Sequence, residues 1–309
     1  MTKQIHASRE YLVHGLMLLT ITLAASSFPV VAAITNELPP EIIMFLRFSL
    51  AAALFAPYVL LKHGLAVPSS AHILRYVILS IPLVAFFWCM FESLRYTSIL
   101  NTGALYTTVP AITAVYALFI NGEAIGKTRS LGLLIGTVGA LWIVFRGDLN
   151  AFLGLELNYG DVIFLIGCLF LGFYNPLIKR FYRGEPMEIM TFWVLISGSV
   201  WLFMISGQNL FHIDWSQVDQ KVYTGVLYLA LFSTLASFFL LQFSTVRIGA
   251  TKVAAYGFLT PVFVIIISIL VGMEAFEPVT TPGILLVIGS MLLIQMETKK
   301  TKAVECSEQ

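Results

Sequence analysis

Ten long apolar segments, separated by short polar connections, divide the sequence. They cover residues 11–34, 40–61, 72–93, 97–119, 130–146, 159–180, 187–207, 221–243, 248–271 and 281–296. A helix needs about 20 apolar residues to cross a bilayer, and it satisfies its own backbone hydrogen bonds where lipid offers no partner. Hydrophobic residues make up 58% of the chain, more than a soluble fold of this size can bury. The sequence therefore predicts an all-α integral membrane protein with ten transmembrane helices in a lipid bilayer.

Lysine and arginine gather at alternate connections. With the N-terminus in the cytoplasm, thirteen of the 18 basic residues fall at cytoplasmic ends of the segments, against three, Arg95, Arg146 and Lys221, at the opposite ends. Cytoplasmic connections carry such an excess of positive charge, so we expect a multi-pass protein of the cytoplasmic (inner) membrane with both termini in the cytoplasm. The apolar run from Leu12 is longer than a signal-peptide core of about 7–15 residues, and we expect it to be retained.

Two stretches far apart in the sequence share one spacing of proline and glutamate. Residues 107–125 read TTVPAITAVYALFINGEAI and residues 258–276 read FLTPVFVIIISILVGMEAF, with a proline thirteen residues before the glutamate in both. A shift of 151 residues aligns these stretches, and a shift of 147 aligns the earlier part of each half. The matching pairs include Pro110 with Pro261, Glu123 with Glu274, Gly132 with Gly283, Pro29 with Pro176, Pro39 with Pro186 and Glu41 with Glu188.

The duplication predicts two five-helix units, residues 1–147 and 155–297, followed by a cytoplasmic tail, residues 298–309. Because five is an odd number, the second unit enters the membrane upside down relative to the first. Two inverted copies are related by a pseudo-two-fold axis in the membrane plane, and transporters use this symmetry to expose one central site alternately to either side. The expected fold is thus ten transmembrane helices as two inverted five-helix repeats.

These repeats resemble the EamA-type transporters of the drug/metabolite transporter (DMT) superfamily. The resemblance is carried by the two units ending in NGEAI and GMEAF, by PPEIIMFLRFSLAAALFAP and by FESLRYTSILNTGALYTTVPAITA. It covers nearly the whole chain and implies ten internally duplicated helices that carry small metabolites across a cytoplasmic membrane. Many family members export amino acids or related solutes, and others move nucleotide sugars or sugar phosphates. Val194 stands at the second-repeat position of Arg47, so any role of that arginine is confined to one repeat.

Two basic residues lie within a predicted helix or near its end. Arg47 stands about seven residues into the second segment, where an arginine costs at least about 2.5 kcal/mol unless it is paired or hydrated. It either contacts an anion or carboxylate in a water-filled cavity, or caps carbonyl groups of a neighbouring helix. Lys252 aligns with Asn101 in the repeat; the two either mark the mouths of a cavity, or Lys252 is an interfacial lysine. All three are candidate substrate-binding residues.

Prolines within helices point to further candidates. A proline removes a helix hydrogen bond and frees a carbonyl, which survives in lipid only where protein or a cavity satisfies it. The prolines assigned a structural or gating role are Pro29, Pro110, Pro176 and Pro261. The remaining candidates for substrate binding are Trp88, Tyr106, Tyr174, Asn175 and Tyr256, although tyrosines in membrane proteins more often serve packing or the interface.

The carboxylates lie near the ends of the predicted helices. Glu123 and Glu274 end the fourth and ninth segments, where they either couple protons or cap the next segment; we assign them a structural or gating role. Glu92 and Arg95 stand three residues apart on one helical face and are expected to pair. No acidic residue lies clearly in the middle third of a segment, where ion-driven carriers commonly place one. We therefore expect facilitated transport or exchange, or coupling that uses Glu92 or a tyrosine. The two basic candidates suit solutes that carry a carboxylate or phosphate.

The sequence as a whole predicts a secondary transporter that exports small organic metabolites, such as amino acids or related carboxylate-bearing solutes, by alternating access. A sugar-phosphate or nucleotide-sugar carrier is the alternative, and a non-transporting membrane sensor or enzyme is the alternative of another class. We find no catalytic constellation, and we predict no enzyme activity, cofactor or metal. The net charge of +1 suggests no nucleic-acid partner, and the oligomeric state is left open. The spacing of Gly132 and Gly136 predicts close helix packing within the molecule.

Overall fold

The computed structural model describes residues 2–34, 37–64, 68–97, 99–154, 157–272 and 277–305. Within these residues the chain is helical and has no strand. Ten segments are long and apolar enough to cross a membrane, which confirms the predicted number. Their bounds lie within a few residues of the predicted ones: Tyr11–Val31, Pro40–His63, Ser70–Ser93, Asn101–Asn121, Lys127–Val144, Tyr159–Phe181, Met187–Gly207, Gln220–Ile248, Ala250–Leu270 and Pro278–Gln295.

Six spans are formed by single helices, and the tenth begins with a short 3-10 turn. The single helices are α1 (Thr2–Ile34), α2 (Pro40–His63), α3 (Ser70–Ser93), α6 (Lys127–Val144), α8 (Tyr159–Phe181) and α9 (Met187–Leu210). The tenth span consists of η3 (Pro278–Thr280) and α14 (Thr281–Glu305). A short helix, α7 (Leu149–Leu153), lies in the connection between the two halves of the chain.

Three spans are interrupted. The fourth consists of α4 (Ile99–Tyr106) and α5 (Val109–Asn121), the eighth of α10 (Gln220–Tyr228), the π-helical η1 (Leu229–Ala236) and α11 (Ser237–Ile248), and the ninth of α12 (Ala250–Ala255), the 3-10 turn η2 (Tyr256–Leu259) and α13 (Thr260–Leu270). Pro110 and Pro261 stand at the starts of α5 and α13. Neither can donate a hydrogen bond to the carbonyl four residues earlier, which explains why both spans break at equivalent positions.

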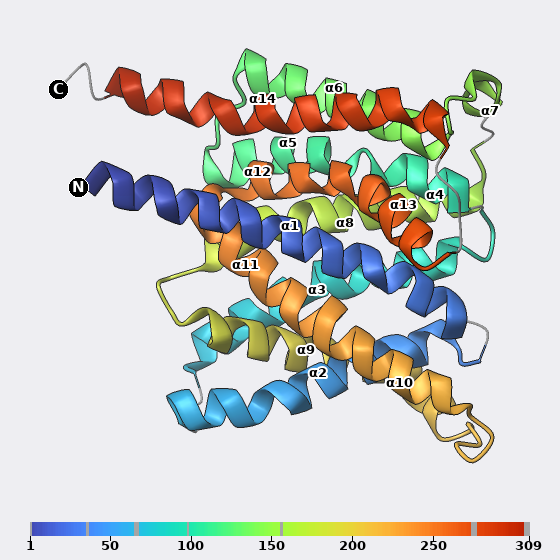
Figure 1. Cartoon of the computed structure of the whole chain (residues 1–309). Helices are drawn as coiled ribbons and strands as arrows, with labels where there is room; N and C mark the ends of the chain where they lie inside the picture. The colour runs from blue at the N-terminus through green and yellow to red at the C-terminus, as the bar shows by residue number, and fades with distance from the viewer. Residues whose placement is uncertain are drawn as a thin grey trace.

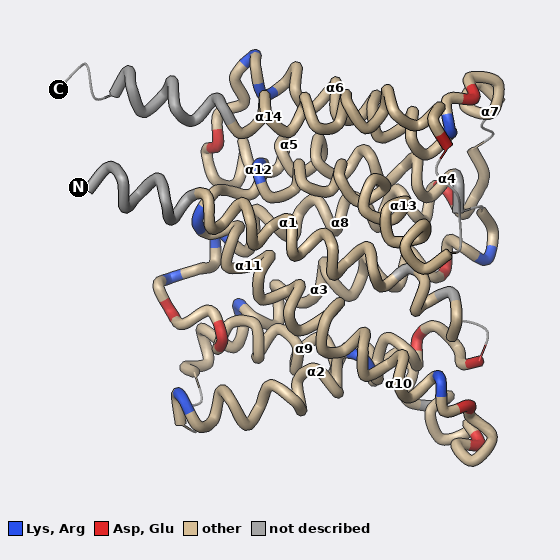
Figure 2. Tube along the Cα trace, in the orientation of Figure 1, with Lys and Arg blue, Asp and Glu red and all other residues tan. Residues whose placement is uncertain are grey.

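The helices lie side by side, with the start of α1 and the end of α14 at the same end of the bundle (Figure 1). We call this end the terminal end and the opposite one the distal end. Lysine, arginine, aspartate and glutamate gather at the two ends, and the middle of the bundle is almost free of them (Figure 2). This distribution suits a bundle whose middle lies in hydrocarbon, where an ionised side chain is costly.

Two contacts between α2 and α9 show the inverted repeat directly. At the terminal end, Lys62 Nζ lies 2.6 Å from Glu188 Oε1. At the distal end, Asn209 Nδ2 donates to Glu41 Oε1 at 3.3 Å. A shift of 147 residues places Glu41 on Glu188 and Lys62 on Asn209, so each contact is the equivalent of the other. The same two residue positions therefore meet at opposite ends of the molecule, as a two-fold relation between the halves requires.

Glycines bring α6 and α14 into close contact. A Cβ atom on Gly139 would lie 2.9 Å from the carbonyl oxygen of Gly283, and a Cβ on Gly283 would lie 2.8 Å from that of Gly139. A Cβ on Gly132 would lie 2.7 Å from Ile294 Cγ1, and one on Gly136 would lie 2.6 Å from the Phe258 ring. No larger side chain fits at this crossing without moving its neighbours. The predicted packing of Gly132 and Gly136 within the molecule is thus confirmed.

Candidate functional site

A cavity of about 440 Å³ lies at the distal end between α2, α3 and α9. Its polar residues, Glu41, Glu92 and Arg95, stand at or just beyond the ends of their helices and form the rim. Arg95 and Glu92 form the predicted pair, with Nη1 3.2 Å from Oε2. The complete lining is Pro39, Pro40, Glu41, Met44, Trp88, Phe91, Glu92, Arg95, Leu202 and Ile205. The cavity is therefore polar at its mouth and apolar further in.

Arg47 lies in α2, one helical turn deeper than Met44 of the cavity lining. Its side chain is only 6% exposed. Nε donates to Thr234 Oγ1 at 2.8 Å, and a terminal nitrogen lies 3.4 Å from Ser233 Oγ. The guanidinium carbon lies 5.2 Å from the centroid of the Phe87 ring. Among the described residues no carboxylate pairs with Arg47, so the neighbouring hydroxyls and ring solvate its charge without neutralising it.

Both hydroxyl partners of Arg47 belong to the π-helical turn η1. A π-turn widens the helix and disturbs its regular hydrogen bonding, and such turns are frequent at functional sites. Here Ser237 Oγ donates to the carbonyl of Phe232 at 2.9 Å. The segment reads LALFSTLA, with no proline or glycine. The sequence therefore gives no signal for the irregular turn, and only the adjacent serine and threonine mark its polar face.

A row of aromatic rings leads from Arg47 toward the break in the fourth span. Phe87 lies beside Arg47, and its ring centroid is 5.2 Å from that of Phe86. The Phe86 ring is in turn 6.3 Å from Tyr106, the last residue of α4. The predicted candidates Arg47 and Tyr106 are thus connected through two phenylalanines of α3.

Tyr106 lies where the interrupted fourth and ninth spans meet. A Cβ on Gly257 would lie 4.0 Å from Tyr106 Cε1 and 3.9 Å from Pro110 Cγ. Gly257 is the second-repeat equivalent of Tyr106 under the shift of 151 residues. Carriers commonly form their substrate sites from discontinuous helices at the interface of the repeats. The crossing of the fourth and ninth spans has this geometry.

The repeat partners Asn101 and Lys252 have different surroundings. Asn101 Nδ2 donates to Asp161 Oδ2 at 3.0 Å. Lys252 is 4% exposed, and its backbone carbonyl accepts a hydrogen bond from Gln295 Nε2 at 3.5 Å. The lysine is therefore buried among the helices, close to the start of α12. Neither residue belongs to the lining of the distal cavity.

Asp161 is a buried acid that our sequence interpretation missed. It is 2% exposed and accepts hydrogen bonds from Thr97 Oγ1 and from the backbone amide of Asn158, the latter at 2.8 Å. Asn158 in turn accepts from the amide of Asp161, which completes a capping box at the start of α8. Asn158 followed three residues later by Asp161 resembles a capping-box pattern, so the sequence contained a signal for this contact.

Two further candidates, Tyr256 and Tyr174, are hydrogen-bonded in the interior. The Tyr256 hydroxyl lies 2.7 Å from His14 Nδ1 of α1. The Tyr174 hydroxyl accepts from Gln242 Nε2 at 2.9 Å. Asn175, beside Tyr174, is 6% exposed, and its Oδ1 has no hydrogen-bond partner among the described residues. Of the eight predicted substrate-binding residues, only Trp88 lies in the lining of the distal cavity.

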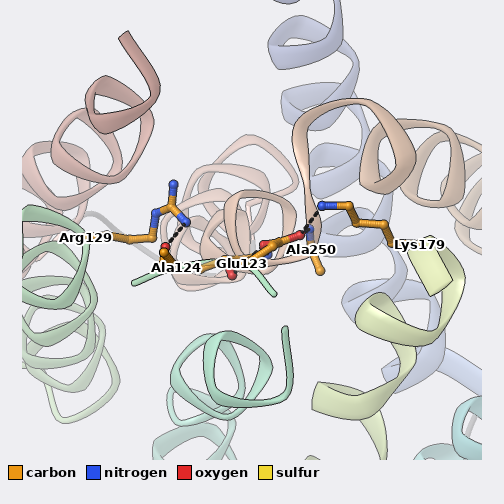
Figure 3. Close-up of polar contacts among 6 residues, drawn as sticks. Glu123, Ala124, Arg129, Lys179 and Ala250 are labelled. Carbon is orange, nitrogen blue, oxygen red and sulfur yellow. Dashed lines mark hydrogen bonds and ion pairs between the residues drawn. The ribbon is translucent and has the colours of Figure 1, made fainter. Parts of the chain in front are cut away.

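Glu123 of the first repeat contacts two helices of the second repeat at the terminal end (Figure 3). Its carboxylate lies 2.8 Å from Lys179 Nζ of α8. It also accepts from the backbone amides of Ala250 at 3.0 Å and Thr251 at 3.3 Å, the first residues of α12. A carboxylate is favourable at a helix N-terminus because it satisfies free amides. Glu123 thus caps a helix, although the helix belongs to the other repeat, and its counterpart Glu274 lies outside the described residues.

The contacts of Glu123 also set its protonation. Burial alone raises the pKa of the carboxyl, but the ammonium of Lys179, the amide of Ala250 and the hydroxyl of Thr251 outweigh it and lower the pKa below the ordinary value of 4.5. Glu123 is therefore ionised at neutral pH. Among the described residues no group of three or more histidine, cysteine, aspartate or glutamate side chains could hold a metal ion.

Comparison with known proteins identifies the family. The model of the EamA-like transporter family matches residues 12–145 and again residues 158–296. The chain belongs to the EamA-like transporter family. A crystal structure superposes with a TM-score of 0.76 at 15% sequence identity, covering 94% of this chain and 99% of the other. At that identity the likeness concerns the fold, and it agrees with ten helices in two inverted repeats.

Several relatives carry the name of transporter. The uncharacterized transporter YyaM of Bacillus subtilis is 27% identical over 80% of each chain. An uncharacterized transporter of Archaeoglobus fulgidus is 26% identical over 82% of this chain and 87% of its own. Adenosine 3'-phospho 5'-phosphosulfate transporter 1 of Dictyostelium discoideum is 22% identical over 81% of this chain and 70% of its own. The protein is thus a multi-pass membrane protein of a transporter family.

Proposed function

We propose that this protein is a secondary carrier that exports small carboxylate-bearing metabolites, such as amino acids, across the cytoplasmic membrane by alternating access. The observation that carries the proposal is Arg47, a buried cation without a carboxylate partner, one turn below a cavity. The family supports transport, and the inverted repeat supports a carrier mechanism in particular.

The chemistry of Arg47 favours an anionic group of the cargo. A buried arginine in a membrane costs at least about 2.5 kcal/mol unless it is paired or hydrated. The guanidinium has five N–H donors in a planar fork that matches a carboxylate, and the contacts to Thr234 and Ser233 occupy only part of them. A carboxylate that enters from the cavity would neutralise the charge through two parallel hydrogen bonds.

The cavity suits a small amphipathic solute. Its volume of about 440 Å³ falls in the range of roughly 300–1,000 Å³ typical of small-molecule sites. Trp88 in the lining offers a ring face to an ammonium group, and Glu41 and Glu92 place negative charge at the rim. An amino acid carries a carboxylate, which can bind Arg47, and an ammonium group, which can bind the acidic residues of the rim.

The direction and energetics of transport are part of the proposal. The excess of lysine and arginine at the terminal end favours a cytoplasmic location of that end, so that the distal cavity opens to the outside. The acidic residues of the ten spans lie near span ends, and none stands in a middle third. We therefore propose exchange or facilitated transport without a mid-membrane proton carrier.

A phosphate-bearing cargo is the second candidate. One relative, at 22% identity, is named as a transporter of adenosine 3'-phospho 5'-phosphosulfate. The same guanidinium fork would bind a phosphate as well as a carboxylate. The two candidates differ in the size and charge of the solute, which a transport assay separates.

The test is counterflow in proteoliposomes that contain the purified full-length chain. The panel holds amino acids, other carboxylates, sugar phosphates and nucleotides, each with and without an imposed pH gradient. We expect saturable exchange of a carboxylate-bearing solute, independent of the gradient. Exchange of phosphates alone would establish the second candidate, accumulation driven by the gradient would contradict uncoupled transport, and no exchange of any solute would contradict the carrier.

The role of Arg47 has its own test. Arg47→Gln should reduce exchange at least tenfold, and Arg47→Lys should recover part of it because the charge returns without the planar fork. The matched control is Arg146→Gln, since Arg146 is 54% exposed and pairs with Glu277 at the distal surface, where such pairs contribute little. Normal exchange with a lower thermal midpoint in Arg47→Gln would assign Arg47 a structural role instead.

A further inference from the structure

The inverted repeat allows the two ends of the molecule to be compared position by position. Met44 and Phe91 line the distal cavity. The shifts of 147 and 151 residues place them on Thr191 and Gln242, respectively. If the two halves had the same conformation, a cavity would also open between Thr191 and Gln242 at the terminal end. The structure has a closed contact there instead.

Three polar side chains make this contact. The Thr191 hydroxyl lies 2.7 Å from Gln242 Oε1 and 2.9 Å from the carbonyl oxygen of Met187 in its own helix, so its single proton is shared between two acceptors. Gln242 Nε2 donates to the hydroxyl of Tyr174 at 2.9 Å. Thr191 and Gln242 are 0% exposed and Tyr174 is 1% exposed. The three residues come from α9, α11 and α8, so their hydrogen bonds join three spans of the second repeat.

We propose that Thr191, Gln242 and Tyr174 form a latch that holds the terminal end of the carrier closed while the distal cavity is open. The inference rests on the alternating access proposed above. When the latch opens, the equivalent residues at the distal end, Met44 and Phe91, close against each other. Tyr174, a candidate substrate-binding residue from the sequence, is thereby assigned to the latch.

A surface contact lies outside the latch at the same end. Lys62 and Glu188 pair at 2.6 Å, with Lys62 46% exposed. At the distal end the equivalent contact is the longer hydrogen bond between Asn209 and Glu41. An exposed ion pair contributes little, whereas hydrogen bonds in a buried network act together. We therefore assign the latch to the buried residues and a minor part to Lys62 and Glu188.

The chemistry of the two ends suits a reversible exchange. When the terminal end opens, the amide and hydroxyls of the latch exchange their mutual hydrogen bonds for hydrogen bonds to water, so that little free energy is lost. When the distal end closes, the partly exposed side chains of Phe91 and Trp88 leave water, which is favourable. A small cost at one end and a limited gain at the other leave the two states close in free energy, as a carrier needs.

The test measures accessibility and needs no substrate. Cys89, Cys168 and Cys306 are replaced by alanine, and one reporter cysteine is introduced. Ile205→Cys reports on the distal cavity, where Ile205 is 46% exposed. Val246→Cys reports on the terminal end, since Val246 is the equivalent of Arg95 at the cavity rim and is packed against the core. A membrane-impermeant maleimide is applied to the distal face for the first reporter and to the terminal face for the second.

The double variant Thr191→Val with Gln242→Leu removes the latch without a large change in volume. We expect the labelling rate at position 205 to fall several-fold and that at position 246 to rise several-fold. The control is Thr245→Val, because Thr245 is equally buried in α11 but donates only to the Leu241 carbonyl of its own helix.

Opposite changes at the two reporters distinguish gating from unfolding. Faster labelling at both positions in the double variant, or no change at either, would overturn the latch. Tyr174→Phe, which removes one hydroxyl, gives a milder version of the same readout if the double variant does not fold. Changed labelling without transport of any panel solute would refute the proposed function and leave the latch standing.

Discussion

The two ends of the molecule are built from equivalent residues and yet have opposite characters. At the distal end, Met44 and Phe91 line an open cavity. At the terminal end, Thr191 and Gln242 occupy the equivalent positions and are hydrogen-bonded out of reach of solvent. The backbone has thus kept its two-fold relation, while side-chain divergence has made one end apolar and the other polar. The difference teaches that the repeat places equivalent positions at both ends, while the side chains at these positions decide whether an end has a cavity or a closed contact.

A position deeper in the bundle, that of Arg47, shows the same divergence between the repeats. Arg47 contacts the hydroxyls of Ser233 and Thr234. Under the repeat, Arg47 corresponds to Val194, and its two partners correspond to Pro82 and Leu83. The second copy of this position is therefore apolar throughout. At this position a cation therefore occurs in the first repeat only, and the anion-binding role proposed for Arg47 has no equivalent in the second repeat.

The largest expected effect comes from placing an arginine at Val194, the position in the second repeat that is equivalent to Arg47. Val194→Arg would bury a second cation among apolar side chains, because Val194 is 0% exposed and belongs to the same core cluster as Leu83 and Val84. We expect a loss of about 2.5–3.5 kcal/mol in the free energy of unfolding, measured as a lower thermal midpoint in detergent. Val194→Leu is the control for volume. An unchanged midpoint in Val194→Arg would mean that water or lipid reaches this position, against the buried contact seen here.

The next prediction copies the latch to the distal end. Met44→Thr with Phe91→Gln places the side chains of the terminal latch in the lining of the distal cavity. Hydrogen bonds between transmembrane helices contribute about 0.6 kcal/mol on average and up to about 1.7, so the one hydrogen bond between the new threonine and glutamine should favour closure by about that amount. We expect slower labelling at Ile205→Cys and slower exchange. Labelling as fast as in the parent protein would show that these two side chains do not form a latch at the equivalent positions of the distal end.

The third prediction concerns pH at the terminal end. The pKa of Glu123 is lowered in the folded protein, so the carboxylate stabilises the fold above its unfolded pKa of about 4.3. This contribution, about 1.5–3 kcal/mol for a hydrogen bond to a charged group, is lost as the pH falls through the folded pKa. Glu123→Gln should therefore lower the thermal midpoint at pH 7 and reduce its dependence on acidification. An equally steep acid dependence in the variant would assign that dependence to other carboxylates.

The smallest effect is expected from the surface contacts. Glu188→Gln breaks the ion pair with Lys62, and Glu41→Gln alters the equivalent contact with Asn209. Exposed pairs contribute about 0–1 kcal/mol, so Glu188→Gln should raise labelling at Val246→Cys slightly and Glu41→Gln should leave it unchanged. The effect of Glu188→Gln should diminish at high salt. If Glu188→Gln had a larger effect than Thr191→Val with Gln242→Leu, the latch would be assigned to the surface ion pair instead of the buried residues.

Much of the fold could be predicted from local patterns. The ten spans follow from hydropathy, because lipid requires each segment to satisfy its own backbone hydrogen bonds. The pairing of Glu92 with Arg95 follows from helical spacing, and the packing of α6 follows from Gly132 and Gly136. Each of these inferences needs only residues that lie within a few turns of one another.

The candidate site could be predicted only in part. Arg47 stands out in the sequence as a charge in an apolar run, and the prediction that it is buried or paired needs no partner to be named. Its actual partners, Ser233 and Thr234, lie more than 180 residues away in a π-turn that has no sequence signature. A latch role for Gln242 and Thr191 could not be predicted from the sequence, because single polar residues are common in helices of membrane proteins.

The sequence by itself determined the spans, the duplication and the inversion. Each follows from the order of apolar residues, prolines, glycines and charged residues along the chain. Only the tertiary structure decided which polar side chains meet, because a hydrogen bond between spans depends on rotation and depth to within an ångström or so. It also decided which end is open, since both ends carry the same backbone. Helix formation in lipid is a local requirement, whereas the difference between two gates is a property of side chains brought together from distant parts of the chain.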